Sequence, residues 1–262
     1  MKVLITRPRV QAEDFAEKLR TAGFEPIFFP VIEIHSIKDN VALSKALEHL
    51  SCYEWVVFTS VNAVNVVFDV IATDVKQSQV EGRELLRSAG SDMSPPKIAA
   101  IGPKTAKALQ AHGVSVDFVP EEYVAEAILP GLGELRGKWV LLPRAEIARK
   151  ALADAITIAG GIAHEIPVYK TLPSKPDFEG LKALKSGVDV ITLTSPSIVQ
   201  NFVAIVKQCG LDPMNLPNDP VFACIGPITE QAAKEEGLRH LVVAKEYTTE
   251  GLMKVISNLE AA

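Results

Sequence analysis

One stretch of this sequence occurs twice. Residues 98–109 are IAAIGPKTAKAL and residues 222–233 are FACIGPITEQAA, in each case an apolar run followed by Gly-Pro and a helical pattern. The likeness continues beyond the helix to Gly113 and Gly237, at the same offset of 124 residues. Self-similarity over this length predicts two copies of a domain-sized unit, because the repeats of solenoid proteins are much shorter.

Other segments match in the same order. VLITR at 3–7 matches VLLPR at 140–144, and FTSVNAVNVVF at 58–68 matches LTSPSIVQNFV at 193–203. Several matches held in one order are not explained by a shared composition. The first copy is longer than the second, and its extra residues fall in the polar stretch 74–96, which we expect to be a surface insertion.

Short apolar runs alternate with amphipathic segments along the whole chain. Most of these runs are continuously apolar rather than alternating, as in parallel strands that are covered on both faces. Strands are expected at 3–6, 25–34, 55–59, 97–101, 116–119, 138–143, 163–171, 189–194, 221–225 and 240–244. The alternation predicts an α/β fold with doubly wound parallel sheets.

The second apolar run of each copy is unusually long. FEPIFFPVIEIHS and HEIPVYKTLPS both exceed the typical strand of about 5–6 residues. Each could leave one domain and enter the other, so that the two form an antiparallel pair of linkers. The chain would then contain one discontinuous domain, a second continuous one and two linkers: 1–34 plus 173–262, 38–168, and linkers near 35–37 and 169–172. A simple tandem of two domains fits the residues equally well.

Composition limits the classes of partner. The chain has 262 residues, 48% of them hydrophobic, and a net charge of −5 with dispersed charges, which gives no basic footprint for nucleic acid or an anionic membrane. No apolar run approaches the ~18 residues of a membrane span, and the opening MKVLITRPR is too short for a signal peptide. We expect a soluble, cytoplasmic protein. Its three cysteines, Cys52, Cys209 and Cys224, are predicted to be reduced, buried thiols.

The repeated turns are the candidate ligand site. Each follows an expected strand and opens an expected helix, which places it at the carboxyl edge of a sheet, where α/β proteins bind ligands. The hydroxyl groups of these turns can have the purely structural role of capping helices. The free N–H groups at the starts of the helices can also bind anions, which would be a functional role. The candidate binding residues are Arg7, Thr59, Ser60, Asn62, Lys104, Thr105, Arg144, Ser195, Ser197 and Thr229. Tyr169, in the second long run, would be a protonated donor or general acid at neutral pH.

Motifs for metal and nucleotide chemistry are missing from the sequence. There is no HExxH, no clustered Cys/His set, no P-loop, no GxSxG elbow and no GxGxxG. The sequence therefore predicts a protein that works without a metal or another cofactor.

The ordered set of motifs resembles the uroporphyrinogen-III synthase family across essentially the whole chain. The residues that carry the resemblance are the duplicated TS and IGP turns, the opening VLITRP, the later VLLPRA and the VYKT segment. The resemblance implies two similar flavodoxin-like domains joined by a two-stranded linker, with the substrate between them, which favours the split arrangement over the tandem. It also implies a cofactor-independent lyase that cyclises hydroxymethylbilane to uroporphyrinogen III, losing water and inverting ring D through a spiro intermediate.

The same resemblance assigns roles to residues. Tyr169 matches the family tyrosine proposed to assist departure of the hydroxyl group, and Thr105 matches a substrate-contacting position of the IGP turn. The other candidates would hold substrate carboxylates, although Lys104 has Ile228 as its counterpart in the second copy. The implied partner is a linear tetrapyrrole, received in a transient handover from the deaminase that makes it, by a monomer.

Two other classes of function remain open at this stage. One is a non-catalytic two-domain protein that closes on a small polyanion. The other is an unrelated two-domain enzyme such as an amino-acid racemase. The absence of a cysteine at equivalent turns of both copies weighs against the racemase, since Cys224 aligns with Ala100.

Overall fold

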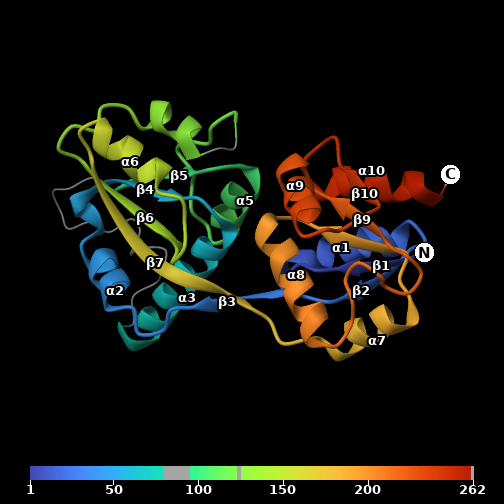
Figure 1. Ribbon diagram of the computed structural model, residues 1–262. Coiled ribbons are helices and arrows are strands. Elements are labelled where there is room, and N and C mark those ends of the chain that lie inside the picture. Colours follow the sequence, from blue (N-terminus) through green and yellow to red (C-terminus); the bar gives the residue numbers. More distant parts are fainter. Residues whose placement is uncertain (79–94, 123–124, 261–262) are drawn as a thin grey trace. The chain divides into compact units, whose positions relative to one another are not determined.

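The chain folds into two compact units. Our computed structural model describes residues 1–78, 95–122 and 125–260. Unit 1 consists of Met1–Glu33 and Leu172–Ala262, and unit 2 of Ile34–Thr171. Within unit 1, strands from the beginning of the sequence lie beside strands from its end, as the blue and the orange to red ribbons of Figure 1 show.

Unit 1 is a parallel sheet covered by helices on both faces. Its strands, in the order β10-β9-β8-β1-β2, are β1 (Lys2–Ile5), β2 (Glu25–Phe28), β8 (Val190–Leu193), β9 (Val221–Cys224) and β10 (Leu241–Val243). Val3 and Ile5 of β1 pack with α1 (Arg9–Thr21) and α10 (Thr249–Glu260). Leu4 points to the other face, where α7 (Phe178–Ser186), α8 (Pro196–Gln208) and α9 (Pro227–Glu235) pack.

Unit 2 has the same layers. Its strands, in the order β3-β7-β6-β4-β5, are β3 (Ile32–Ser36), β4 (Tyr53–Phe58), β5 (Lys97–Ala100), β6 (Trp139–Ala145) and β7 (Ile162–Pro173). Val56 and Phe58 pack with α2 (Val41–Glu48), α3 (Val61–Ser78) and α5 (Pro103–Ala111). Trp55 and Val57 pack with the 3₁₀ helix η2 (Ala125–Leu132) and α6 (Ala151–Ile158), and a short 3₁₀ helix, η1 (Leu50–Cys52), precedes β4. Continuously apolar strands are thus buried from both sides, which confirms the predicted α/β fold with parallel sheets.

Matching segments occupy matching places in the two sheets. Read from one edge, unit 1 has β2-β1-β8-β9 and unit 2 has β7-β6-β4-β5. The segments VLIT and VLLP lie in β1 and β6, and the strands before the two TS turns are β8 and β4. β9 and β5 both precede an IGP turn.

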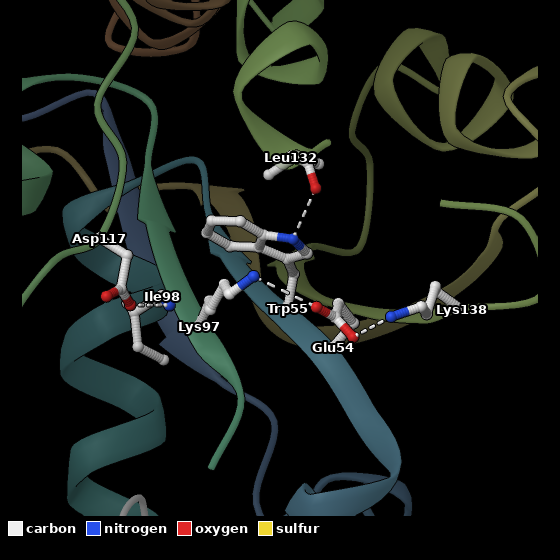
Figure 2. Close-up of polar contacts among 7 residues, drawn as sticks. All are labelled: Glu54, Trp55, Lys97, Ile98, Asp117, Leu132 and Lys138. Carbon is white, nitrogen blue, oxygen red and sulfur yellow. Dashed lines mark hydrogen bonds and ion pairs between the residues drawn. The ribbon is translucent and has the colours of Figure 1, made fainter. Parts of the chain in front are cut away.

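The predicted strand at 116–119 is wrong. Phe118 forms only an isolated parallel bridge with Ala99. The neighbouring Asp117 accepts the Ile98 N–H with its carboxylate, at 2.7 Å, and donates its own N–H to the Ile98 carbonyl, at 2.8 Å. Figure 2 shows the carboxylate turned onto Ile98. The Asp117 side chain thus accepts the Ile98 N–H that a backbone carbonyl would accept in a regular ladder, and no strand forms at 116–119.

The predicted single strand at 25–34 is also wrong, because it is broken at Pro30. β2 ends at Phe28 and β3 begins at Ile32. Pro30 lies in the gap between the two strands and has no N–H to donate to a ladder. After it, the Val31 carbonyl accepts the Ser174 N–H at 3.1 Å and the Ile37 N–H donates to the Val168 carbonyl at 2.9 Å. From Val31 to Ile37 the residue numbers rise while those of their partners fall from Ser174 to Val168, so the two segments are antiparallel.

Charged side chains link the strand starts in unit 2. Glu54 forms ion pairs with Lys97, at 3.3 Å, and with Lys138. The Lys97 ammonium lies 5.4 Å from the centre of the Trp55 ring, whose N–H donates to the Leu132 carbonyl at 2.9 Å (Figure 2). The hydrogen bond from Lys138 is the main cause that lowers the pKa of Glu54. These partners are largely exposed, so the pairs contribute little energy, but the buried indole hydrogen bond fixes η2 on the sheet.

The structure also bears on the expected burial of the cysteines and on the expected insertion at 74–96. Cys224 is buried and Cys209 is partly buried, but Cys52 is exposed at the end of η1, so its predicted burial is wrong. Of the predicted insertion 74–96, residues 79–94 lie outside the described residues. None of the helices described is both long and apolar enough to cross a membrane.

Replacing Asp117 tests the hydrogen bond that substitutes for a strand. Asp117→Ala should lower the free energy of unfolding by about 1 kcal/mol, because it leaves the N–H of the buried Ile98 without its acceptor. Asp117→Asn keeps an acceptor oxygen and should cost less. Urea unfolding of the full chain measures both. Equal losses in the two variants would contradict the role of the acceptor.

Candidate functional site

The candidate residues collect at the carboxyl edges of the two sheets. Parallel strands end at a common edge, so turns that are distant in sequence become neighbours there. Unit 2 places Thr59, Ser60, Asn62, Lys104, Thr105, Arg144 and Tyr169 at this edge. Unit 1 places Arg7, Ser195, Ser197 and Thr229 at its own.

Tyr169 lies against the turn after β4. Its side chain is 7% exposed, and its hydroxyl is 3.2 Å from the hydroxyl oxygen of Ser60. Ser60 caps α3, because its side-chain oxygen accepts the Ala63 N–H at 3.1 Å. The backbone of Tyr169 is held as well, since its carbonyl accepts the Glu146 N–H at 2.9 Å and the residue pairs with Ala145 of β6. The phenol is thus fixed in direction at the edge of the sheet.

The two IGP turns have the same backbone. Gly102 and Gly226 both have φ −172° and ψ 175°, and a proline follows each in the first turn of its helix. These dihedral angles suit any residue, but space is tight at 226, where a Cβ would lie 3.2 Å from the exposed Tyr247 ring and would require that ring to shift slightly. Thr105 and Thr229 are 4% and 3% exposed, and Lys104 is exposed. The free N–H groups of each helix start point to the edge.

The turn after β8 has a pair of hydroxyls. Ser195 caps α8 by accepting the Ile198 N–H at 3.3 Å, and its hydroxyl is 3.0 Å from that of Ser197. Ser195 thus has the capping role that Ser60 has in unit 2. Asn62, the counterpart of Ser197, and Thr59 are half-buried at the start of α3. Capping explains Ser60 and Ser195 structurally, and each hydroxyl keeps a proton that it can donate to the neighbouring hydroxyl of Tyr169 or Ser197 or to a ligand.

Arg144 has partners within its own unit. Its side chain is buried and forms an ion pair with Glu165 of β7. A second guanidinium nitrogen donates to the Arg149 carbonyl. Sequence reasoning missed Glu165, because the corresponding position in the other copy is the apolar Phe28 and the repeat gave no sign of a carboxylate. Arg144 is thereby tied into the fold of unit 2.

Arg7 is placed differently from its counterpart. It is half-buried after β1, and its guanidinium donates to the side-chain oxygen of Gln11 at 3.3 Å. Burial lowers the pKa of Arg7, but arginine stays charged at neutral pH. In the described ranges no carboxylate forms an ion pair with it. A partly desolvated cation with an uncharged neighbour is a suitable site for an anionic group.

Metal and thiol chemistry find little support among these residues. Within the residues described, no group of three or more His, Cys, Asp and Glu side chains could hold a metal ion. Cys224 lies at the end of β9 near the edge, but burial raises the pKa of its thiol to about 12. It is therefore protonated at neutral pH and a poor nucleophile.

Comparisons with known proteins cover nearly the entire chain. The model of the family described as "Uroporphyrinogen-III synthase HemD" matches residues 13–254. This chain belongs to the uroporphyrinogen-III synthase family. A relative named uroporphyrinogen-III synthase, from Synechococcus elongatus, is 31% identical over 97% of this chain and 93% of its own length. A putative uroporphyrinogen-III synthase from Methanocaldococcus jannaschii is 31% identical over 99% of both chains.

Solved structures of the family have the same fold. A uroporphyrinogen-III synthetase from Helicobacter pylori superposes with a TM-score of 0.65 at 19% identity, over 98% of this chain and 99% of that one. A mutant uroporphyrinogen III synthase from Thermus thermophilus gives a TM-score of 0.60 at 20% identity, over the whole of both chains. The family model and the two named relatives confirm the resemblance that the sequence motifs indicated.

The two arginines should differ in their effect on stability. Arg144→Ala leaves the Glu165 carboxylate and the Arg149 carbonyl without their partner, and should lower the free energy of unfolding by about 1–3 kcal/mol. Arg7→Ala is the matched control, and should change it by less than about 0.5 kcal/mol. Urea denaturation compares the two variants. A larger loss for Arg7→Ala would mean that Arg7, too, serves the fold.

Proposed function

We propose that this chain is a uroporphyrinogen-III synthase, which cyclises hydroxymethylbilane to uroporphyrinogen III in tetrapyrrole biosynthesis. The observation that carries the proposal is the match of the family model over residues 13–254, because it leaves neither unit outside the family. The reaction is a lyase reaction that releases water and inverts ring D. It needs no cofactor.

The two units are proposed to be copies of one ancestral, flavodoxin-like domain. The order of the matching segments supports this proposal. Strand β1 corresponds to β6, β8 to β4 and β9 to β5, and the two strands of each pair are followed by similar turns. The bridge at Phe118 stands where β10 stands in the other copy. The linker of the proposed domains is the antiparallel pair formed by β3 and β7.

The proposed substrate is a polyanion, whereas the protein has a net charge of −5. Helix starts resolve this conflict, because each favours an anion by about 0.3–1 kcal/mol without adding a charged residue. The turns with Thr59, Ser60 and Asn62, with Lys104 and Thr105, with Ser195 and Ser197, and with Thr229 supply such starts. Arg7 is the arginine best suited to a substrate carboxylate, and Arg144 the less suited, because Glu165 already neutralises it.

Tyr169 is proposed as the acid that assists the first step. The bilane hydroxyl takes a proton and leaves as water, and an azafulvene cation remains. Ring D then attacks through its substituted carbon, and the spiro intermediate fragments and recloses with that ring inverted. A phenol held by Ser60 is a directed donor for the leaving hydroxyl. The remaining catalysis is positional, since the flexible bilane must be held in one reactive conformer.

The two other classes of function fit less well. A thiol-dependent racemase needs a cysteine thiolate as the base that takes the α-proton of its substrate, whereas burial keeps the Cys224 thiol protonated. A non-catalytic polyanion-binding protein would use the same turns, and only an assay separates it from the enzyme. We also propose a cytoplasmic monomer that receives its substrate from the deaminase in a transient handover.

The isomer of the product tests the proposed function. Porphobilinogen and its deaminase generate the bilane in the presence of this protein, and the oxidised porphyrins are separated by chromatography. We expect the type III isomer well above the control without this protein, because the bilane cyclises unaided to type I. Type I alone from folded protein would contradict the proposal and favour the binding protein.

Tyr169→Phe tests the proposed acid. Turnover should fall by about tenfold or more, with less change in KM, because a proton donor is lost while most of the side-chain volume remains. Ser60→Ala is the comparison: it keeps the phenol but removes the neighbouring hydroxyl. Steady-state kinetics on folded variants measure both effects. Unchanged turnover in Tyr169→Phe would end its role as the acid.

A further inference from the structure

A hollow lies at the amino-terminal ends of strands in the sheet of unit 2, opposite the carboxyl edge. A cavity of about 600 Å³ is lined by α2 and by residues at the beginnings of strands, among them Lys45, His49, Tyr53, Trp139 and His164. Tyr53 and Trp139 are the first residues of β4 and β6, and His164 is the third residue of β7. The candidate active-site residues of this unit lie at the other ends of these strands, in the turn after β4 and, for Arg144 and Tyr169, where the end of β6 pairs with β7. The cavity, here called the α2 pocket, is therefore a separate place on the unit.

Three rings of the α2 pocket hold one another in place. The Tyr53 and His164 rings are stacked, with centres 5.9 Å apart and planes 19° apart. The Trp139 ring stands edge-on to both, at 6.3 Å from Tyr53 and 6.0 Å from His164. The Tyr53 hydroxyl lies 2.6 Å from Nδ1 of His164. The arrangement keeps an indole, 44% of which is exposed, in a fixed orientation toward the cavity.

Hydrogen bonds determine what the histidines can offer a ligand. Burial raises the pKa of Tyr53, so its hydroxyl stays protonated and can donate to Nδ1 of His164. The Nε2 atom of His164 then carries the proton of the neutral ring and is a donor. Nδ1 of His49 lies 2.9 Å from the Lys45 carbonyl, which can only accept, so this nitrogen carries a proton.

The charge of the α2 pocket is positive. Lys45 is exposed, and no acidic residue is among the described residues that line the cavity. No carboxylate in the part of the chain that we describe forms an ion pair with Lys45. The ammonium group and the histidine donor stand beside an otherwise apolar wall, which includes Ala42 and Ala46 of α2.

We propose that the α2 pocket is a binding site for a planar aromatic compound that bears a carboxylate. The fixed rings of Trp139, Tyr53 and His164 offer stacking and edge contacts to a flat ring system. Lys45 and the His164 donor face the negative group. The volume lies within the range of about 300–1,000 Å³ of small-molecule pockets. The site is independent of the proposed synthase reaction.

Three small compounds test separately whether the pocket recognises a flat ring system and whether it recognises a carboxylate. Isothermal titration of the full chain with 2-naphthoate should give one site, and 2-naphthalenemethanol and decalin-2-carboxylate should bind at least about fivefold more weakly. The first comparison compound lacks the charge and the second lacks the flat ring. Quenching of tryptophan fluorescence reports the same event, because the chain has two tryptophans and Trp55 is only 4% exposed. Equal affinity for the three probes, or no binding of 2-naphthoate, would overturn the proposal.

Variants place the probe on the protein. Lys45→Gln should weaken 2-naphthoate about threefold to fivefold and leave 2-naphthalenemethanol unchanged, because the exposed charge contributes only modestly. Trp139→Leu should weaken both by about tenfold or more. Lys107→Gln, an exposed lysine on α5, is the matched control and should change neither.

Two results would overturn the assignment. Loss of 2-naphthoate binding in Arg7→Ala, with normal binding in Lys45→Gln, would move the probe to the carboxyl edge of unit 1. Sedimentation velocity decides the other alternative. A dimer that dissociates in Trp139→Leu, without any 2-naphthoate binding in the parent chain, would mean that the pocket is covered by a second copy.

Discussion

Burial of a parallel sheet on both faces is the constraint on which this structure depends. Because Val3 and Ile5 pack on one face and Leu4 on the other, the central strands of unit 1 are largely apolar, and helices connect neighbouring parallel strands. The same rule holds in unit 2, where Trp55 and Val56 face opposite layers. One consequence is functional: all strand-to-helix turns of a sheet lie at one edge, so short polar turns gather there without a dedicated loop.

The edges separate residues that serve the fold from residues that are available for a ligand. Ser60 and Ser195 do both, because a capping oxygen accepts a backbone N–H while its hydroxyl proton can be donated, either to the neighbouring hydroxyl of Tyr169 or Ser197 or to a ligand. Arg144 and Arg7 divide the two tasks. Glu165 neutralises the first, whereas the second is partly desolvated beside Gln11. An enzyme that mainly positions a flexible polyanion can work with such a sparse set of groups, and this agrees with the absence of familiar catalytic motifs from the sequence.

The opposite edge of unit 2 has a different chemistry. There, Glu54 links Lys97 and Lys138, and Trp55 is fixed by its hydrogen bond to Leu132 (Figure 2). Beside this polar network, Trp139, Tyr53 and His164 form the rigid aromatic wall of the α2 pocket. The positions that begin these strands are not needed by the proposed reaction. An exposed indole and a lysine that forms no ion pair with the residues described are the features at this edge on which the proposed second binding site rests.

The sequence by itself determined the α/β class, the positions of most strands along the chain and the family. Continuous apolar runs and repeated turns are local patterns, so they can be read without the tertiary structure. The sequence also located most of the carboxyl-edge residues, since they lie in the turns after strands, whereas Arg144 and Tyr169 lie within β6 and β7. Only the tertiary structure decided which of them pair: the Tyr169–Ser60 contact joins residues 109 positions apart, and the partner of Arg144 lies on a neighbouring strand. The tertiary structure also showed that the Asp117 side chain takes a hydrogen bond in place of the strand expected at 116–119. It showed as well that Cys52 is exposed. Side-chain partners depend on the register between strands, and no local pattern encodes that register.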